Sequence, residues 1–325
     1  MVHLMFHNRM INRRLLRTKV LHAFYAFEKR GGEKLDLAEK ELFHSIEKMF
    51  ELYYLLFLLL IEIADYSKSR IDLALQKRKP TEEDLNPNTK FIDNWFIREL
   101  RDNPTFKEVI EKKKISWVNY PEVVRKLYQV ILASDDYQDY TKNPAGPNED
   151  KKFIIKIYSN YIAASEDLYQ CLEEQSIYWN DDLEFITGMI VKTFKKFKEE
   201  DGPDKPLMEL YKNKEDSDYV VKLYRQTILH REEYVEYIKQ NTRNWDLERI
   251  AFMDILIMQI AIAELVAFPS IPTKVTLNEY LEISKFYSTS KSNVFINGVL
   301  DKVVFQLKED KLIVKKGRGL IGEND

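Results

Sequence analysis

The sequence contains few of the residues that interrupt helices or cross-link chains. Its 325 residues include nine glycines, ten prolines and one cysteine. Glycine and proline are the least favourable residues in a helix interior, so their scarcity predicts an all-α protein. The single cysteine, Cys171, excludes a disulfide within the chain and fits a reducing compartment. We therefore expect a buried thiol and a cytoplasmic location.

The motifs of common enzyme classes are also missing. We find no phosphate-binding loop and no Gly-x-Ser-x-Gly elbow. Glu41 and His44 form one Glu-x-x-His spacing, whereas a di-iron bundle needs two such motifs and two further glutamates. We therefore expect no enzyme activity, no metal and no cofactor.

No stretch of the sequence is apolar for long enough to predict a membrane span. The strongest apolar run, residues 52–61, is bounded by two glutamates. It is only about half as long as the ~20 apolar residues that a bilayer requires. This run predicts the most buried helix of the core and no membrane contact.

The positive charge of the sequence is local. A formal net charge of −3 argues against a protein that binds polyanions over its whole surface. However, Arg13, Arg14, Arg17 and Lys19 occupy the first turns of a predicted amphipathic helix over residues 10–27. Cations there are unfavourable, because the N-terminal end of a helix already carries partial positive charge. This cluster therefore needs an explanation.

Four interpretations of the cluster are open, namely solvated charge, an RNA site, a DNA site and contact with an anionic membrane. Arg13 and Arg17 lie one helical turn apart, and Arg14 is next to Arg13. Their guanidinium groups can therefore converge on successive phosphates. Lys19 joins the group because of its charge and proximity.

The chain divides into helical blocks. Three breaks contain proline or glycine, at residues 76–90, 139–151 and 199–206. A long helical pattern precedes the first break, at residues 37–75. A nearly all-apolar helix is predicted within residues 244–268, where it must be central to its bundle.

The C-terminal block contains a family pattern. It combines a Pro-x-Lys-Val entry, an Asn-Glu pair on the next helix and a Phe-Ile-Asn-Gly-Val-Leu-Asp run. These elements are Pro272, Lys274 and Val275, then Asn278 and Glu279, then residues 295–301. The N-terminal arginines, followed by Ala23, Phe24 and Tyr25, match a second element in the right order. Together these motifs resemble the NusB family of transcription antitermination factors, and in particular its longer members of the Bacteroidetes type.

The resemblance implies a NusB-like fold of two packed helical bundles with a large helical insertion. We expect NusB-like N-terminal helices over residues 10–66 and the insertion over 67–215. A NusB-like C-terminal bundle would then occupy residues 216–308, and a loose tail residues 309–325.

The resemblance also implies a function. Family members bind single-stranded RNA of the boxA type together with the small ribosomal subunit protein NusE, and so assist the RNA polymerase elongation complex during ribosomal RNA synthesis. Accordingly, we expect RNA contacts from Arg13, Arg14, Arg17 and Phe295, and we add Lys19 because of its charge and proximity. The four cations would neutralise phosphates, and Phe295 would stack on a base. By position, Tyr25 and Asp254 match family residues at the NusE contact.

Structural alternatives exist for several of these residues. Tyr25 and Phe295 are equally compatible with core packing, and Asp254 with a local ion pair to Arg249 or Lys302. Two other functions also stay open. One is a protein-interaction scaffold without RNA binding, with insertion aromatics such as Trp117 as either interface or core. The other is a relic of the RNA-binding domain of a ribosomal RNA methyltransferase.

Overall fold

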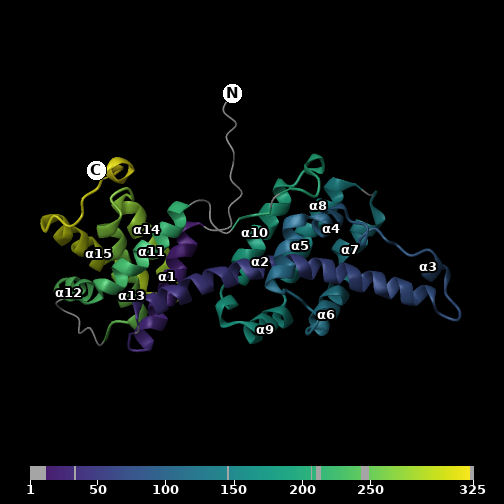
Figure 1. Ribbon diagram of the computed structural model, residues 1–325, viewed down its shortest axis with the longest axis horizontal. Coiled ribbons are helices and arrows are strands. Elements are labelled where there is room, and N and C mark those ends of the chain that lie inside the picture. The colour runs from purple at the N-terminus through teal and green to yellow at the C-terminus, as the bar shows by residue number, and fades with distance from the viewer. Residues whose placement is uncertain are drawn as a thin grey trace, which may run out of the picture. The chain divides into compact units, whose positions relative to one another are not determined.

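The computed structural model describes residues 12–32, 34–144, 146–205, 207–209, 214–242 and 249–322. Within these ranges the regular structure is helical and no β-strand occurs, so the all-α prediction is confirmed (Figure 1). None of the helices described combines the length and apolar character needed to cross a membrane. Cys171 is buried, as expected, and burial raises the pKa of its thiol.

The chain forms two compact units. The central unit comprises Ser45–Leu210, and the terminal unit comprises Ile11–His44 together with Tyr211–Asp325. Helix α2 (Leu35–Leu75) contributes its first residues to the terminal unit and the remainder to the central unit. By packing, therefore, the central unit begins inside α2, at Ser45, whereas the bounds that the resemblance gave for the insertion, residues 67–215, stay a prediction.

The reason lies in the apolar run of α2. Three aromatic side chains of the central unit donate hydrogen bonds to backbone carbonyls of this helix. Trp117 Nε1 bonds to Leu55 O at 2.9 Å, Tyr158 Oη to Leu56 O at 2.9 Å and Trp179 Nε1 to Lys48 O at 2.6 Å. The run at residues 52–61 is thus covered by the segment expected to be an insertion.

The central unit is built around α2 from short helices. They are α3 (Glu82–Leu85), α4 (Trp95–Asp102), α5 (Pro104–Lys113), α6 (Pro121–Leu132), α7 (Asp135–Lys142), α8 (Pro147–Lys156), the π-helix η1 (Ile157–Ile162), α9 (Glu166–Gln175), η2 (Ile177–Trp179), α10 (Leu183–Lys196) and η3 (Glu199–Asp201). Trp117 is buried, which favours the core interpretation for this residue, whereas Trp95 and Tyr120 are half-buried.

The terminal unit surrounds one apolar helix. Its helices are α1 (Arg13–Lys29), the start of α2, α11 (Lys214–Leu229), α12 (Arg231–Asn241), α13 (Phe252–Ala267), α14 (Thr273–Tyr287) and α15 (Ser292–Glu309), followed by the 3₁₀ turn η5 (Gly317–Leu320). Helix α13 contacts α1, α11, α12, α14 and α15, and it is buried along most of its length. The prediction of a central helix in this region is therefore confirmed.

Helix α1 begins at a regular cap. The side chain of Asn12 accepts a hydrogen bond from Leu15 N at 2.8 Å, which satisfies one free N–H of the first turn. Leu16, Val20 and Phe24 form its buried stripe against α11 and α13. This stripe fixes which way the arginines of the first turn face.

The C-terminal segment differs from the expected loose tail. Lys316 N donates to Pro269 O at 2.9 Å, and Lys315 Nζ donates to Leu265 O and Phe268 O at 3.0 and 3.3 Å. Lys315 and Lys316 are therefore held against the C-terminal end of α13 and the residues that follow it. These contacts are mostly to backbone carbonyls, which leave no periodic pattern in the sequence.

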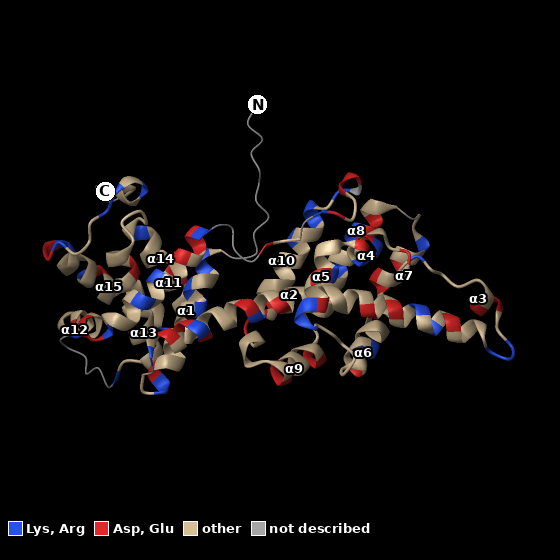
Figure 2. Ribbon diagram, in the orientation of Figure 1, with Lys and Arg blue, Asp and Glu red and all other residues tan. Residues whose placement is uncertain are grey.

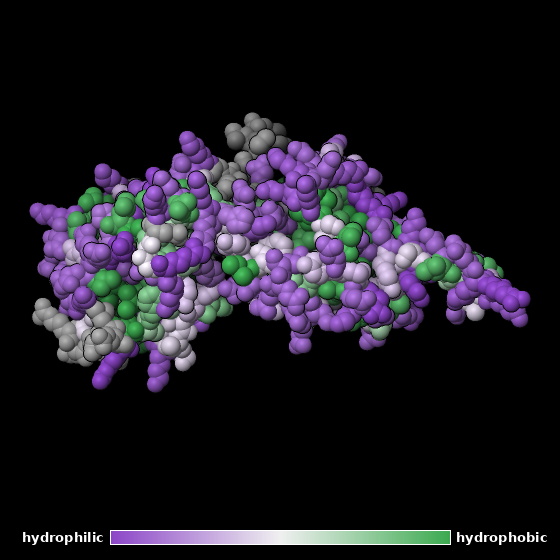
Figure 3. Space-filling view, turned by 60° about the horizontal axis from the view of Figure 1, so that its bottom comes forward, coloured by the Kyte–Doolittle hydropathy of each residue, from purple (hydrophilic) through white to green (hydrophobic). Residues whose placement is uncertain are grey.

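Charges of both signs are mixed along the described helices (Figure 2). In Figure 2, Lys and Arg are interspersed with Asp and Glu along the helices of both units. The face shown in Figure 3 is largely hydrophilic, with separate hydrophobic patches. A nucleic-acid site therefore has to be a local feature, as the net charge of −3 indicates.

Candidate nucleic-acid interface

A pocket of about 540 Å³ lies in the terminal unit at the start of α1. We call it the arginine pocket. Its walls come from the first turn of α1, from the loop and first turns of α14, and from the C-terminal segment. The residues that line it are Asn12, Arg13, Arg14, Arg17, Ser270, Ile271, Pro272, Val275, Glu279, Arg318 and Ile321.

The two pocket arginines of the first turn of α1, Arg13 and Arg14, are on the surface. The side chain of Arg14 is 52% exposed and that of Arg13 is 43% exposed. Arg14 donates to both carboxylate oxygens of Glu279, at 2.8 and 3.0 Å, and this hydrogen bonding raises the pKa of Arg14. Arg13 lies over the ring of Tyr219 at 5.0 Å and is 4.0 Å from Asp216. Both keep exposed guanidinium surface.

Arg17 is buried instead, with 3% of its side chain exposed. It donates from Nε and Nη2 to the two oxygens of Glu264, at 2.7 and 2.8 Å, and from Nη1 to Glu279 at 3.3 Å. Burial lowers the pKa of Arg17, but its hydrogen bond and charge interaction with Glu264 outweigh this, so the net shift is upward. The expected direct phosphate contact of Arg17 is therefore not available in this structure.

Glu264 is the centre of a buried polar network. Besides Arg17, it accepts hydrogen bonds from the hydroxyls of Tyr219 at 2.5 Å, Thr276 at 2.8 Å and Tyr280 at 3.2 Å. The network joins α1, α11, α13 and α14. Glu264 on α13 and Glu279 on α14 thus compensate the positive charge of Arg17 and Arg14 in the first turns of α1. This explains in part why cations are tolerated at the N-terminal end of this helix.

Lys19 and Phe295 do not line the arginine pocket. Lys19 is buried, and it follows Arg17 by two residues, which places it on a different side of the helix. Its contact with phosphate stays a prediction, at a position outside the arginine pocket. Phe295 is half-buried on α15, and its stacking role stays a prediction.

Arg318 is a pocket residue that the sequence analysis missed. It is exposed, lies in the 3₁₀ turn η5 and lines the pocket with Arg13 and Arg14. A signal was present, because Gly317, Gly319 and Gly322 have Gly-x-Gly-x-x-Gly spacing around it. That spacing marks a dinucleotide site only between a strand and a helix. Here it forms a tight turn.

The two expected NusE-contact residues occupy different environments. Tyr25 is 38% exposed and packs edge-on against Phe252, with ring centroids 5.8 Å apart. Lys29 Nζ lies 4.3 Å from the centroid of the Phe252 ring and 5.5 Å from that of Tyr25. We call Tyr25, Lys29 and Phe252 the aromatic patch. An exposed aromatic group of this kind is typical of a protein-binding surface.

Asp254 is buried at the junction of α14 and α15. It accepts hydrogen bonds from the hydroxyls of Ser288 and Ser292, the latter at 2.9 Å. The alternative of an ion pair with Arg249 or Lys302 is therefore wrong. Asp254 can support a surface through this junction, but its carboxylate does not face solvent.

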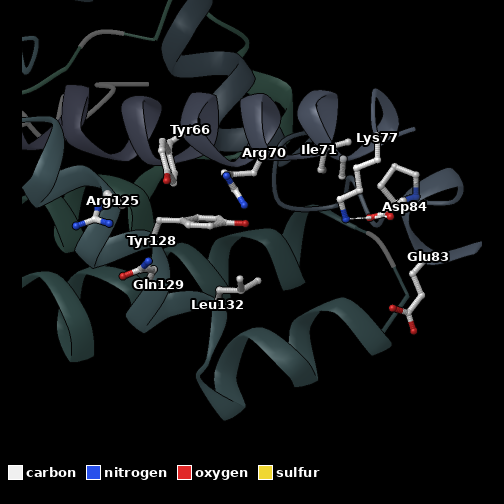
Figure 4. Close-up of a pocket in the computed structure, with 12 residues that line it drawn as sticks. Tyr66, Arg70, Ile71, Lys77, Glu83, Asp84, Arg125, Tyr128, Gln129 and Leu132 are labelled. Carbon is white, nitrogen blue, oxygen red and sulfur yellow. Dashed lines mark hydrogen bonds and ion pairs between the residues drawn. The ribbon is translucent and has the colours of Figure 1, made fainter. Parts of the chain in front are cut away.

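A further pocket, of about 640 Å³, lies in the central unit between α2, α3 and α6 (Figure 4). Tyr66 and Tyr128 meet edge-on there, with ring centroids 5.2 Å apart. Of its lining cations, Lys77 pairs with Asp84 at 2.8 Å and Arg125 pairs with Glu122. Its lining holds three cations and two acids, whereas the arginine pocket holds four arginines and one acid, so this pocket is a weaker candidate for a polyanion.

The described residues contain no group of three or more His, Cys, Asp or Glu side chains placed to hold a metal ion. Fold and site together therefore define a helical protein with one local, arginine-lined surface pocket. Such a pocket suits an anionic ligand.

Comparison with known proteins gives the family. The NusB family model matches residues 188–305. Proteins named transcription antitermination protein NusB are similar over the same third of the chain. The relative from Salinibacter ruber is 40% identical over 105 residues, 32% of this chain and 66% of the relative. That from Chloroherpeton thalassium is 38% identical over 104 residues, 32% of this chain and 49% of the relative.

A third relative, from Natranaerobius thermophilus, is 38% identical over 101 residues, which are 30% of this chain and 73% of the relative. The chain belongs to the NusB family, as the sequence motifs indicated. The match covers about two thirds of the first relative's length and half of the second's. No solved structure gives a significant match. Glu264 and Glu279 lie within the residues that the NusB family model matches, whereas α1 and Arg318 lie outside them.

Proposed function

We propose that this protein is a cytoplasmic, non-enzymatic transcription antitermination factor that binds boxA-type single-stranded RNA together with NusE. It would act on the RNA polymerase elongation complex during ribosomal RNA synthesis. The observation that carries this proposal is the arginine pocket of a NusB-family chain, where exposed Arg13 and Arg14 meet at the start of α1.

The pocket has the properties that a phosphodiester backbone requires. Exposed guanidinium groups form bidentate, charge-assisted hydrogen bonds with phosphate. The N-terminal ends of α1 and α14 both line the pocket and add partial positive charge. Val275 and Ile321, which are 44% and 68% exposed, supply apolar surface beside the cations, against which an unstacked base can pack.

Arg17 has a different role in this proposal from the one expected. Its guanidinium holds Glu264 and also reaches Glu279, the partner of Arg14. We infer that Arg17 positions the first turn of α1, whereas Arg13 and Arg14 contact phosphates. Glu279 would exchange its hydrogen bonds with Arg14 for solvent when RNA binds.

The first test measures binding of a boxA-containing single-stranded RNA and of a scrambled RNA, with and without NusE. Arg13→Ala/Arg14→Ala should weaken boxA binding by roughly 10- to 100-fold, because two charge-assisted contacts are lost. The slope of log K against log salt should decrease in magnitude by about 1.4, since each phosphate contact to a single strand contributes about 0.7.

The matched control is Arg125→Ala/Lys126→Ala, which removes two neighbouring exposed cations of α6. It should leave boxA affinity within about twofold. Weak binding to both RNAs that is equal in wild type and in the Arg13→Ala/Arg14→Ala variant would contradict the proposal. The interaction-scaffold function would then be the better account.

The aromatic patch is proposed as the NusE contact. In Tyr25→Ala, the increase in boxA affinity that NusE provides should be about tenfold smaller than in wild type. The reason is that interface tyrosines often carry about 1 kcal/mol or more of binding energy. Binding of RNA without NusE should be unchanged. Tyr169→Ala is the control, since Tyr169 is similarly exposed at 42% but lies on α9 of the central unit. An undiminished NusE effect in Tyr25→Ala would place the partner elsewhere.

A further inference from the structure

The C-terminal segment Lys315–Gly322 is fixed to the terminal unit by specific contacts. The ammonium group of Lys315 bonds to two carbonyls at the end of α13, and the backbone N–H of Lys316 bonds to Pro269 O at 2.9 Å. Leu265 O is one of the free acceptors that every helix leaves at its C-terminal end, whereas Phe268 O also accepts from Ile271 N at 3.1 Å and Pro269 lies beyond the helix. The segment therefore completes the end of α13 and also leads the chain toward the arginine pocket.

Gly319 allows the closest approach of this segment. A Cβ atom at this position would lie 1.9 Å from Pro269 O, which is backbone and cannot rotate away. Any larger residue would therefore force the segment and the loop before α14 apart. Gly319 is buried in the turn, and its neighbour Arg318 is exposed.

This anchoring places two side chains in the arginine pocket. Arg318 and Ile321 line it opposite residues of α1 and α14. The other pocket arginines have acidic neighbours, as with Arg14 and Glu279 at 2.8 Å and Arg17 and Glu264 at 2.7 Å. Among the ion pairs of the described residues Arg318 has no acidic partner, so its charge is the least compensated in the pocket.

We propose that the Lys315–Gly322 segment forms part of the RNA-binding site. In this proposal Arg318 binds a phosphate and Ile321 packs against an adjacent base. This inference rests on the proposed RNA-binding function and extends it. The segment lies beyond residue 305, where the NusB family match ends. It thus adds a basic wall that the matched region does not supply.

Two variants test separately the charge of Arg318 and the anchored position of the segment. Arg318→Ala removes the guanidinium and keeps the anchor. Gly319→Ala keeps the guanidinium and displaces the anchor. Each should weaken binding of a boxA-containing single-stranded RNA by roughly fivefold to tenfold. Arg318→Ala should also reduce the magnitude of the salt slope by about 0.7. The double variant should be little weaker than Gly319→Ala alone, because both act on one contact.

Two controls match these variants, one within the segment and one on α15. Lys316→Ala removes a neighbouring exposed cation that does not line the pocket, and Gly298→Ala adds a methyl group where nothing lies within 4 Å. Both should bind the RNA within about twofold of wild type. Far-UV circular dichroism of all variants should retain the helical spectrum.

The outcomes distinguish this inference from the proposed function. If Arg318→Ala and Gly319→Ala bind normally while Arg13→Ala/Arg14→Ala does not, the segment is only structural and the RNA site stands without it. Tighter binding by Gly319→Ala would mean that the segment covers the pocket, which also overturns the inference. If none of these variants changes binding, the proposed function itself fails.

Discussion

Replacing Arg17 with alanine is expected to lower the free energy of unfolding of the terminal unit by about 3–5 kcal/mol. The substitution leaves the carboxylate of Glu264 buried, with 0% of its side chain exposed, and without a cation. The hydroxyls of Tyr219, Thr276 and Tyr280 still donate to it, but they supply no compensating charge. An unpaired buried charge costs far more than an ordinary surface ion pair contributes.

The same network predicts a dependence on pH. Burial raises the pKa of Glu264, but hydrogen bonds and charge from Arg17, with the hydroxyls of Tyr219 and Thr276, lower it below the ordinary value of 4.5. A carboxyl whose pKa is lower in the folded state stabilises the fold above its unfolded pKa, and this contribution is lost as the pH falls through the folded value. The wild-type protein should therefore lose stability below about pH 4.5.

In Arg17→Ala the shift of the Glu264 pKa is expected to change direction, because burial then acts on the carboxyl without the cation and raises its pKa. The penalty of the substitution should therefore become smaller as the pH falls from neutral toward about 4, where Glu264 is protonated on folding. Hydrogen exchange of the α1 and α13 amides, read by mass spectrometry at several pH values, measures both effects.

Two further variants test the cause. Arg30→Ala breaks an exposed ion pair with Glu41 and should cost at most about 1 kcal/mol. Arg17→Met/Glu264→Gln removes both charges and keeps a carbonyl for the three hydroxyls, so it should be less destabilised than Arg17→Ala. A loss under 1 kcal/mol in Arg17→Ala would mean that water enters and solvates Glu264.

Arg17 also shows how far the sequence alone leads. For the cations in the first turns of α1 the sequence analysis considered solvated charge, RNA, DNA and an anionic membrane, but not an acid of the same chain. The sequence could not show whether the anion was a phosphate or a carboxylate of the same chain. Glu264 lies 247 positions from Arg17, and only the packing of α1 on α13 brings the two together. Arg13 and Arg14, by contrast, have exposed surface as expected.

The helices themselves were predictable, because periodicity and breaks are local. The long helix expected over residues 37–75 is α2 (Leu35–Leu75), and the apolar helix before Pro269 is α13. The division into units was not predictable, since α2 continues through it without a proline, a glycine or a change of pattern. Arg318 was missed for a similar reason, because backbone carbonyls hold the segment that carries it.

The other large effect is expected in the central unit. Trp117 is 1% exposed and donates to Leu55 O inside the apolar run of α2, so Trp117→Ala should lower the free energy of unfolding of this unit by about 3–5 kcal/mol. The loss has three causes: the substitution leaves a cavity, it removes buried apolar area, and it takes the Trp117 N–H donor away from Leu55 O. Val118→Ala is the matched control, because the adjacent Val118 is 80% exposed and should change stability by less than about 0.5 kcal/mol.

Trp117→Ala also tests which of the two units holds the RNA site. All the residues that line the arginine pocket belong to the terminal unit, so Trp117→Ala should bind boxA-containing RNA within about twofold of wild type at temperatures where the terminal unit is folded. Hydrogen exchange of α2 and α6 amides would report the weakened central unit in the same sample. A loss of RNA binding that follows the loss of protection in α2 and α6 would show that the central unit contributes to the RNA site. RNA binding that persists while these amides exchange freely would assign the RNA site to the terminal unit and leave the central unit for another partner.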